Sequence, residues 1–242
     1  MQFIIKKEKE NNMSNVDNLK ISNMYDLTHT LAAPLLSECT FPWEALPKIG
    51  NFIKKLGETL SAEEYESKGE NIWIHKSAKI YPTANIYGPV IIGPETEVRP
   101  GAFVRGNALV GANCVVGNST ELKNVIIFDN VQVPHCNYVG DSVLGYKSHM
   151  GAGSITSNVK SDKTLVVVKG YDEYSDICIE TGLKKFGAMI GDYVEVGCNS
   201  VLNPGSVIGR NTNIYPLSPI RGYVPEGSIV KTGNVIVSKK EN

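Results

Sequence analysis

The aliphatic positions of this chain recur at every sixth residue over two long stretches. The first series has nine members: Ile74, Ile80, Ile86, Ile92, Val98, Val104, Val110, Val116 and Leu122. The second series is Ile190, Val196, Leu202, Ile208, Ile214 and Ile220. The residue two places before each position is usually small or β-branched, as at Ala78, Ala102 and Ser206. A helix has a period of about 3.6 and a half-buried strand a period of 2, so neither explains the pattern as one long element.

A period of six predicts a parallel β-helix of short strands, in which three hexads form one triangular coil. Each aliphatic side chain then points toward the axis and stacks on its counterpart in the next coil. β-Helices of hexapeptide repeats are the left-handed exception to the usual right-handed crossover between parallel strands. We therefore expect an all-β fold, a left-handed parallel β-helix over residues 71–232.

The register shifts between the two series. The step from Val116 to Val133 is one residue shorter than three hexads, and so is the step from Val133 to Met150. Departures from a regular pattern tend to fall at functional sites. The stretch VPHCNYVGDSVLGYKSHMGAGSITSN, residues 133–158, lies in this slipped part. Residues 155–187 then break the period, and we expect them to leave the β-helix as an excursion loop that includes a hairpin.

The segments outside the repeat have other patterns. Helical spacing in residues 23–70 predicts a small helical cap on the first coil, and one apolar face is formed by Leu46, Ile49, Ile53 and Leu56. Residues 1–22 are polar and are expected to be a disordered leader. Residues 233–242 follow the last repeat and are assigned as a C-terminal tail.

Composition narrows the possible partners and the compartment. The formal net charge is -1, which argues against a nucleic-acid partner. The five cysteines are dispersed without a CxxC pair, so neither a disulfide framework nor a structural zinc site is expected, and a reducing, cytoplasmic compartment fits best. No apolar run approaches the length of a membrane span, so a membrane partner is not expected either.

A β-helix filled by stacked aliphatic side chains has no interior cavity, so any site must lie on its outside. Flat sides favour association between copies, and a triangular section suits a cyclic homotrimer. Arg105 and Lys123 are three hexads apart, which is one full coil, and should lie one above the other. Such a pair is a candidate clamp for phosphate or carboxylate. The alternative is a solvated face with Glu121 or Glu97 as partners.

Two of the chain's four histidines lie in the slipped stretch. His135 has Tyr138 close by and the glycine-rich GAGS about one coil later, where bare corners would let a ligand approach the backbone. Histidine is the natural general base at neutral pH, although a lone histidine can also be structural. His149 could be a second base or a metal ligand. The histidines form no close pair, so a zinc site is not expected, and no metal ligands are assigned.

Four segments carry a family resemblance: VGNSTELKN (116–124), VPHCNYVGDSVLG (133–145), MGAGSITSN (150–158) and LKKFGAMIGD (183–192). With them, about two thirds of the chain resembles the C-terminal acetyltransferase domain of the bifunctional N-acetylglucosamine-1-phosphate uridyltransferase/glucosamine-1-phosphate acetyltransferase. The archaeal sugar-phosphate nucleotidylyltransferases with an acetyltransferase tail are more similar still.

The resemblance implies roles for individual residues. His135 matches the general base that takes a proton from the sugar amine, and Asn158 matches an asparagine at the reacting centre. The sugar-phosphate contacts are matched by Arg105, Lys123, Tyr138, Lys163 and His149, the last standing where the family usually has Asn. Contacts to acetyl-CoA are matched by Ala152, through its backbone amide, and by Cys198 and Pro216.

The sequence also departs from the family pattern. The loop after Asn158 reads Val159, Lys160, Ser161 in place of the usual Tyr-Asp-Gly. No glycine-rich nucleotidyltransferase loop precedes residue 74, so uridylyl transfer is not expected from this chain.

Two hypotheses from different classes follow. The first is an acetyl-CoA-dependent N-acetyltransferase of an amino-sugar phosphate, with glucosamine-1-phosphate as first candidate and direct attack by the amine. The alternative is a non-catalytic sugar-phosphate-binding, regulatory or assembly module. A sensor would retain the phosphate clamp but would not need to bind CoA.

Overall fold

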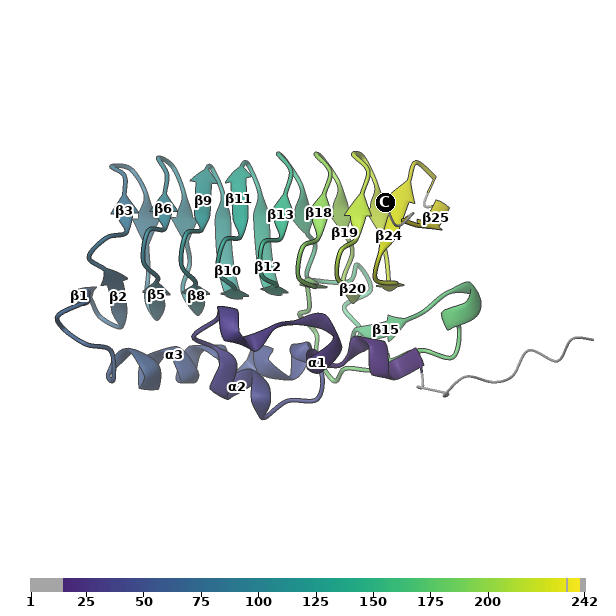
Figure 1. The fold of residues 1–242 in the computed structure, drawn as a ribbon, viewed down its shortest axis with the longest axis horizontal. Coiled ribbons are helices and arrows are strands. Elements are labelled where there is room, and N and C mark those ends of the chain that lie inside the picture. The colour runs from purple at the N-terminus through teal and green to yellow at the C-terminus, as the bar shows by residue number, and fades with distance from the viewer. Residues whose placement is uncertain (1–14, 234, 240–242) are drawn as a thin grey trace, which may run out of the picture.

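The computed structural model describes residues 15–233 and 235–239, and most of them form a parallel β-helix whose coils follow one another along its long axis (Figure 1). Its strands pair on three faces. Face A consists of β2 (Ile72–His75), β5 (Val90–Ile92), β8 (Ala108–Val110), the second halves of β10 (Glu121–Ile127) and β12 (Tyr138–Leu144), β17 (Ala188–Ile190), β20 (Ser206–Ile208) and β23 (Tyr223–Val224). Face B consists of β3 (Lys79–Ile80), β6 (Glu97–Val98), β9 (Val115–Asn118), β11 (Gln132–His135), β13 (His149–Met150), β18 (Glu195–Val196), β21 (Asn213–Ile214) and β24 (Ser228–Lys231). Face C consists of β4 (Asn85–Ile86), β7 (Phe103–Val104), the first halves of β10 and β12, β14 (Ile155–Thr156), β19 (Val201–Leu202) and β22 (Pro219–Ile220).

The register of the strands follows the sixfold series. Its successive members lie on faces A, B and C in turn, and members three hexads apart are partners: Ile74 with Ile92, Ile80 with Val98 and Ile86 with Val104. The expected fold class, an all-β left-handed parallel β-helix of hexapeptide repeats, is therefore confirmed.

The two shortened coils lose their residue at the corner between faces C and A. There β10 and β12 run continuously around the corner, and Leu122 and Ile127, both inward-pointing, are five positions apart instead of six. The corner residues Asn124 and Asp141 have positive φ angles of 55° and 48°. Asparagine and aspartate tolerate this left-handed conformation better than most residues.

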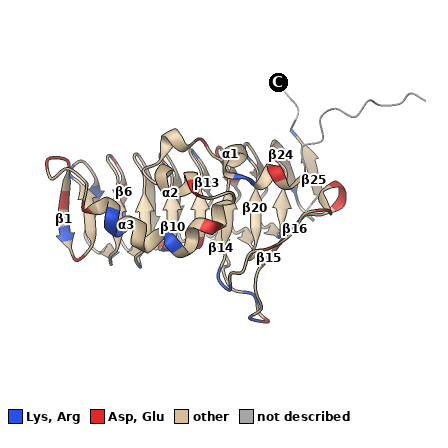
Figure 2. Cartoon of the chain, turned by 90° about the horizontal axis from the view of Figure 1, so that it is seen from below, with Lys and Arg blue, Asp and Glu red and all other residues tan. Residues whose placement is uncertain are grey.

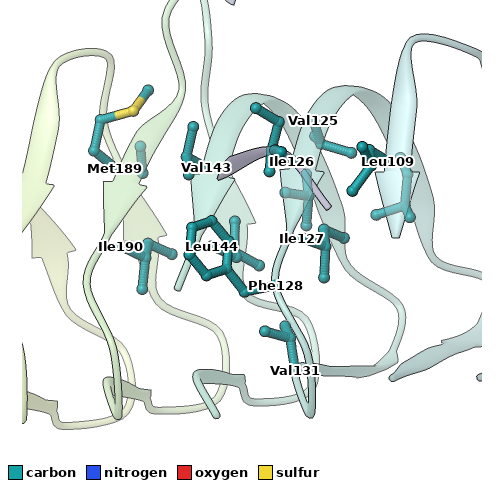
Figure 3. Packing of buried hydrophobic residues seen from close by; sticks show 14 of the residues in the cluster. Leu109, Val125, Ile126, Ile127, Phe128, Val131, Val143, Leu144, Met189 and Ile190 are labelled. Carbon is teal, nitrogen blue, oxygen red and sulfur yellow. The ribbon is translucent and has the colours of Figure 1, made fainter. Parts of the chain in front are cut away.

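Face A is buried on both of its sides. Inward-pointing Ile127, Leu144 and Ile190 fill the coil, whereas Ile126 and Val143 project from the opposite side of the same strands (Figure 3). All five are at most 1% exposed. Burial of side chains of this size stabilises a fold by roughly 1.5–3 kcal/mol each, so the outer surface of face A needs a cover.

The cover is the N-terminal segment, which lies along one long side of the β-helix (Figure 1). Its elements are η1 (Asn15–Leu19), α1 (Ile21–Met24), η2 (Leu27–His29), α2 (Ala33–Ser37), η3 (Pro42–Lys48) and α3 (Ile49–Gly57). α3 packs on β5, β8 and β10, and η3 packs on β12. At the other end of the segment, the Asp26 amide donates to the buried Asp192 carboxylate at 2.8 Å.

This position corrects two of the expectations. The helical segment is not a cap on the first coil, because its apolar residues pack against the outward aliphatic side chains of several coils. The disordered leader does not extend to residue 22: Leu19 is fully buried, and the Ile21 amide donates to the Thr40 carbonyl. Residues 1–14 of the expected leader lie outside the described residues. In the part of the chain that is described, no helix is long and apolar enough to cross a bilayer.

An antiparallel strand pairs with the first coil and another with the last coil of the β-helix. β1 (Tyr65–Gly69) pairs with β2, so the last part of the segment expected to be helical is a strand. β25 (Val235–Ser238) pairs with β24, which places a strand within the segment assigned as tail.

The excursion loop begins later than expected, because residues 155–156 form β14 within face C. The loop carries the expected hairpin, made of β15 (Val167–Lys169) and β16 (Cys178–Glu180), with η4 (Asp172–Tyr174) between its strands. Val166 and Val168 are fully buried, so the hairpin is packed against the molecule.

Candidate functional site

A column of side chains at the corner between faces C and A forms the polar centre of the site. Asn124, Asp141 and Asn158 follow one another at intervals of one shortened coil. Asn124 Nδ2 donates to Asp141 Oδ1 at 2.9 Å, and Asn158 Nδ2 donates to Asp141 Oδ2 at 2.6 Å. Lys123 Nζ lies 3.5 Å from Asp141 Oδ2, and the Asp141 side chain is only 6% exposed. One buried carboxylate therefore orients two asparagines and a lysine.

Tyr138 joins this column from face C. Its hydroxyl oxygen accepts a second hydrogen bond from Asn158 Nδ2 at 3.1 Å. Gly140 leaves the space that the Tyr138 ring occupies, because a Cβ at this position would lie only 2.5 Å from the Tyr138 hydroxyl oxygen. Burial, and then the charge of Asp141, raise the pKa of Tyr138 above its usual value. The phenol thus stays protonated at neutral pH and has its proton available to donate to a ligand.

Arg105 and Lys123 are stacked on face C, since the parallel register places Val104 beside Leu122. Arg105 Nη1 lies 2.5 Å from Glu121 Oε1, while Lys123 is paired with Asp141. The stacking agrees with the count along the sequence. Each cation, however, has a carboxylate partner within the chain. The partner of Arg105 is Glu121, which the alternative of a solvated face had named. An anion held by both would compete with Glu121 for Arg105.

A second column lies at the corner between faces B and C, and it brings together His135, Ala152, Cys198 and Pro216. Backbone hydrogen bonds link the first three of these corners to the next coil: Gly153 N to His135 O at 3.0 Å, Asn199 N to Ala152 O at 2.9 Å and Leu217 N to Cys198 O at 2.9 Å. The His135 and Cys198 side chains are exposed. This column is continuous over four coils, and it runs along one edge of face C.

Asn137 fixes the corner that presents His135. Its side-chain oxygen accepts from the His135 amide at 3.1 Å, and its Nδ2 donates to the Gly151 and Ser154 carbonyls at 2.8 and 3.1 Å. Asn137 is 3% exposed. A buried amide whose hydrogen bonds are all satisfied holds the turn in one conformation. Asn137 therefore fixes the position of the His135 backbone relative to the glycine-rich corner in the next coil.

His149 lies apart from the other matched residues. It is on face B, where its Nδ1 is 2.9 Å from Glu195 Oε2. Its neighbours in the sheet are Gln132 and Glu195. Within one chain, His149 therefore cannot reach the surface of face C that carries Tyr138.

Lys163 is exposed in the excursion loop at a positive φ of 58°, and none of its described contacts ties it to the Asp141 column. Among the described residues, no three His, Cys, Asp or Glu side chains are grouped so that they could hold a metal ion.

Sequence reasoning missed Asp141 and Asn124. Both could have been found by extending the spacing of the shortened coils backward from Asn158, because side chains at equivalent corners of successive coils are neighbours. Aspartate and asparagine are common in tight turns, so their presence at a corner does not by itself indicate a site. The hydrogen bonds to the buried carboxylate show that these residues act together.

Comparison with known proteins identifies the homologues. The model of the GMPPB C-terminal domain family matches residues 86–172. The bifunctional protein GlmU of Methanococcus maripaludis strain S2 is 36% identical over 206 residues, which cover 83% of this chain and 48% of that protein. A bifunctional sugar-1-phosphate nucleotidylyltransferase/acetyltransferase of Sulfurisphaera tokodaii is 34% identical over 113 residues, covering 47% of this chain and 27% of that protein.

The resemblance drawn from the motifs is thus confirmed: the homologues are GlmU bifunctional proteins and an archaeal sugar-1-phosphate nucleotidylyltransferase/acetyltransferase. The chain spans about half the length, or less, of these relatives. Among solved structures, a putative acetyltransferase of Bacillus cereus matches with a TM-score of 0.38 and 16% identity, covering 69% of this chain and 77% of that one.

Proposed function

We propose that this chain is an N-acetyltransferase that transfers the acetyl group of acetyl-CoA to the amine of an amino-sugar phosphate, with glucosamine-1-phosphate as the first acceptor to test. The observation that carries the proposal is the pair of columns bordering face C. His135 and the residues matched to CoA contacts border one edge, and Asn158, Tyr138 and Lys123 border the other. An acceptor lying across face C would contact both.

The roles of the two edges follow from their chemistry. Arg105 and Lys123 hold the phosphate through charge-assisted hydrogen bonds, and the protonated Tyr138 donates a further one. At the opposite edge, the thioester lies along the corner at Ala152, Cys198 and Pro216. This arrangement places the amine of the sugar between His135 and Asn158.

The reaction needs no covalent enzyme intermediate. The amine nitrogen attacks the thioester carbonyl carbon while His135 takes a proton from that nitrogen. The tetrahedral intermediate collapses, the carbon–sulfur bond breaks, and the thiolate of CoA leaves and is protonated. Asn158 and the Ala152 amide orient the amine or stabilise the negative charge on the carbonyl oxygen.

The position of His149 supports a site shared between copies of the chain. Because His149 is on face B and the phosphate residues are on face C, it can contribute only if face B of one copy meets face C of another. A cyclic homotrimer of triangular prisms brings two such faces together at each interface. In this arrangement Glu195 orients the imidazole of His149 toward the acceptor of the neighbouring site.

The test is release of free thiol from acetyl-CoA in the presence of glucosamine-1-phosphate and a panel of other amino-sugar phosphates. We expect turnover on one acceptor, and a loss of about a hundredfold or more in His135→Ala, since a general base contributes roughly that much. His75→Ala is the matched control, because His75 lies on β2 in the first coil and bonds to Ser77. It should retain full activity.

The alternative, a sugar-phosphate sensor, predicts a different outcome of the same experiment. A folded protein that binds an amino-sugar phosphate but releases no thiol on any acceptor would contradict the enzyme proposal and support the sensor.

A further inference from the structure

The excursion loop and the later coils enclose a cleft of about 450 Å³, and none of the residues assigned above to the reaction lines it. One wall is made by Lys160, Asp162 and the hairpin residues Lys169 and Tyr171; the other includes Arg221. Ser157 and Asn203 lie at its floor, at the same outer position of face C as Arg105 and Lys123 in earlier coils. The cleft is thus a continuation of face C beyond the Tyr138–Asn158 pair.

The walls of this cleft are held in place by close backbone packing. A Cβ at Gly222 would overlap the Lys169 carbonyl oxygen, and one at Gly205 would lie 2.9 Å from Val166 Cγ1. Both glycines have positive φ. Only glycine lets the hairpin approach the coils this closely, so the cleft is a built feature of the fold.

The charge of the cleft is opposite to that of the chain. Its lining includes three cations (Lys160, Lys169 and Arg221) and one carboxylate (Asp162), a net of +2 by 3 − 1, against −1 for the whole sequence. Lys160 is paired with Asp162 at 3.3 Å. Lys169 and Arg221 have no ion-pair partner among the described residues. The loop between β14 and β15 projects from the side of the coils and carries both basic and acidic positions (Figure 2). Two unpaired cations facing one cleft favour a polyanionic ligand.

A second hollow of about 430 Å³ adjoins the first and shares Tyr171, Asn203 and Arg221 with it. Its other lining residues are one carboxylate, Asp172, and otherwise apolar side chains, among them Ile220, Tyr223 and Val230. Over both hollows three cations face two carboxylates, so the net charge is still positive. Tyr171 is 46% exposed, so part of it is open to a ligand. The combined site therefore has a cationic half, an aromatic side chain at the boundary and an apolar half.

We propose that this double cleft binds a nucleoside phosphate, with its phosphates on Lys169 and Arg221 and its base against Tyr171. The planar base can stack on the ring of Tyr171. The negatively charged phosphates can form charge-assisted hydrogen bonds with Lys169 and Arg221. Two sources share this chemistry: the nucleotide end of an acyl-CoA and the nucleoside diphosphate of a nucleotide sugar. The acyl-CoA source rests on the proposed function, whereas binding of a nucleotide sugar would stand without it.

The experiment is isothermal titration of the full chain with adenosine 3′,5′-bisphosphate, which is the nucleotide end of CoA, with UDP and with inorganic pyrophosphate. We expect one nucleotide to bind, with pyrophosphate weaker by about tenfold or more, since stacking of the base contributes roughly 1.4 kcal/mol or more. Preference for the adenine nucleotide identifies the acyl donor as the source, and preference for UDP identifies a nucleotide sugar.

Variants locate the binding. The double variant Lys169→Gln/Arg221→Gln should weaken the preferred nucleotide by about tenfold or more. Tyr171→Leu should weaken the nucleotide but leave pyrophosphate unchanged. Lys55→Gln, which removes one exposed charge from α3, should change neither. Thermal melting checks that each variant is folded. The proposal is overturned if neither nucleotide binds, if pyrophosphate binds as tightly as both, or if the cleft variants bind like the unchanged protein.

Discussion

Asp141 accepts hydrogen bonds from Asn124 and Asn158 and lies near Lys123, yet its side chain is almost wholly buried. A buried carboxylate is costly unless its oxygens are satisfied, and here the partners are residues assigned to substrate binding or neighbours of them. We infer that Asp141 is a positioning residue, which sets the orientation of the Asn158 amide without touching the acceptor.

The variant Asp141→Asn tests this role. Its amide offers only one acceptor oxygen and directs an NH₂ group toward the NH₂ of Asn124 or Asn158. We expect a loss of about 1–3 kcal/mol in the free energy of unfolding and a fall in kcat of about tenfold or more. Chemical denaturation and the thiol-release assay give the two numbers. Asp162→Asn, an exposed carboxylate in the excursion loop, should change the stability by less than about 0.5 kcal/mol. Equal effects of the two variants would refute the assignment.

The cysteines give a second prediction for single residues. Burial raises the pKa of the Cys114 thiol to about 12, so its thiolate is scarcely populated in the folded protein. Cys136, Cys178 and Cys198 are exposed. We expect a thiol reagent at pH 8 to modify these three quickly and Cys114 only after unfolding, as measured by peptide mass analysis. Acetyl-CoA should slow modification of Cys198 and leave that of Cys178 unchanged; equal rates at Cys198 with and without acetyl-CoA would argue against the CoA position.

At the scale of elements, the packing of the N-terminal segment on face A determines which sides of the prism stay open. Strand residues Ile126 and Val143 point away from the axis but are fully buried. Ile49 and Ile53 of α3 are fully buried in the same core. Helix and strands therefore share one apolar layer outside the coil.

The contribution of this layer to stability can be measured by comparing alanine variants of two valines that both point outward from their strands. Val143 is fully buried, and Val115 on face B is partly exposed. Val143→Ala should lower the free energy of unfolding by about 2 kcal/mol through lost burial and a residual cavity, and Val115→Ala by less than about 1 kcal/mol. Denaturant titrations of both variants make the comparison. A smaller loss for Val143 than for Val115 would mean that the helical segment is not firmly packed in solution.

The coils were predictable from the sequence because each inward position contacts only its counterparts in adjacent coils. A strict period of six therefore specifies Ile74, Ile92 and Val110 directly. The place of the helical segment was not predicted, although its signal was present: Ile91, Leu109 and Ile126 form an outward apolar series one residue before the inward one. Its meaning depends on which distant segment covers it, and helical spacing alone does not identify the surface that a helix contacts.

At the scale of the whole molecule, the chain is a prism with one side covered by its own N-terminal segment. Faces B and C are not covered by this segment, and they carry His149 and the Tyr138–Asn158 pair, respectively. The sequence correctly placed Arg105 beside Lys123, because both follow an inward residue of face C. Counting also places His149 on face B, because it directly precedes the inward-pointing Met150. The proposed contribution of His149 to a second copy's site could not be predicted, because it depends on how the copies associate.

A catalytic site shared between two copies is best tested by acetyl transfer in mixed assemblies of two variants that are each expected to be inactive, His135→Ala and His149→Ala. Each site is proposed to take His135 from one copy and His149 from its neighbour, so each variant alone has no intact site. After dissociation and reassembly in equal amounts, about a quarter of the sites should contain both histidines, and activity should recover toward that fraction of the unchanged protein. A mixture that stays as inactive as its components, or a His149→Ala variant that is fully active alone, would contradict a catalytic site shared between faces B and C.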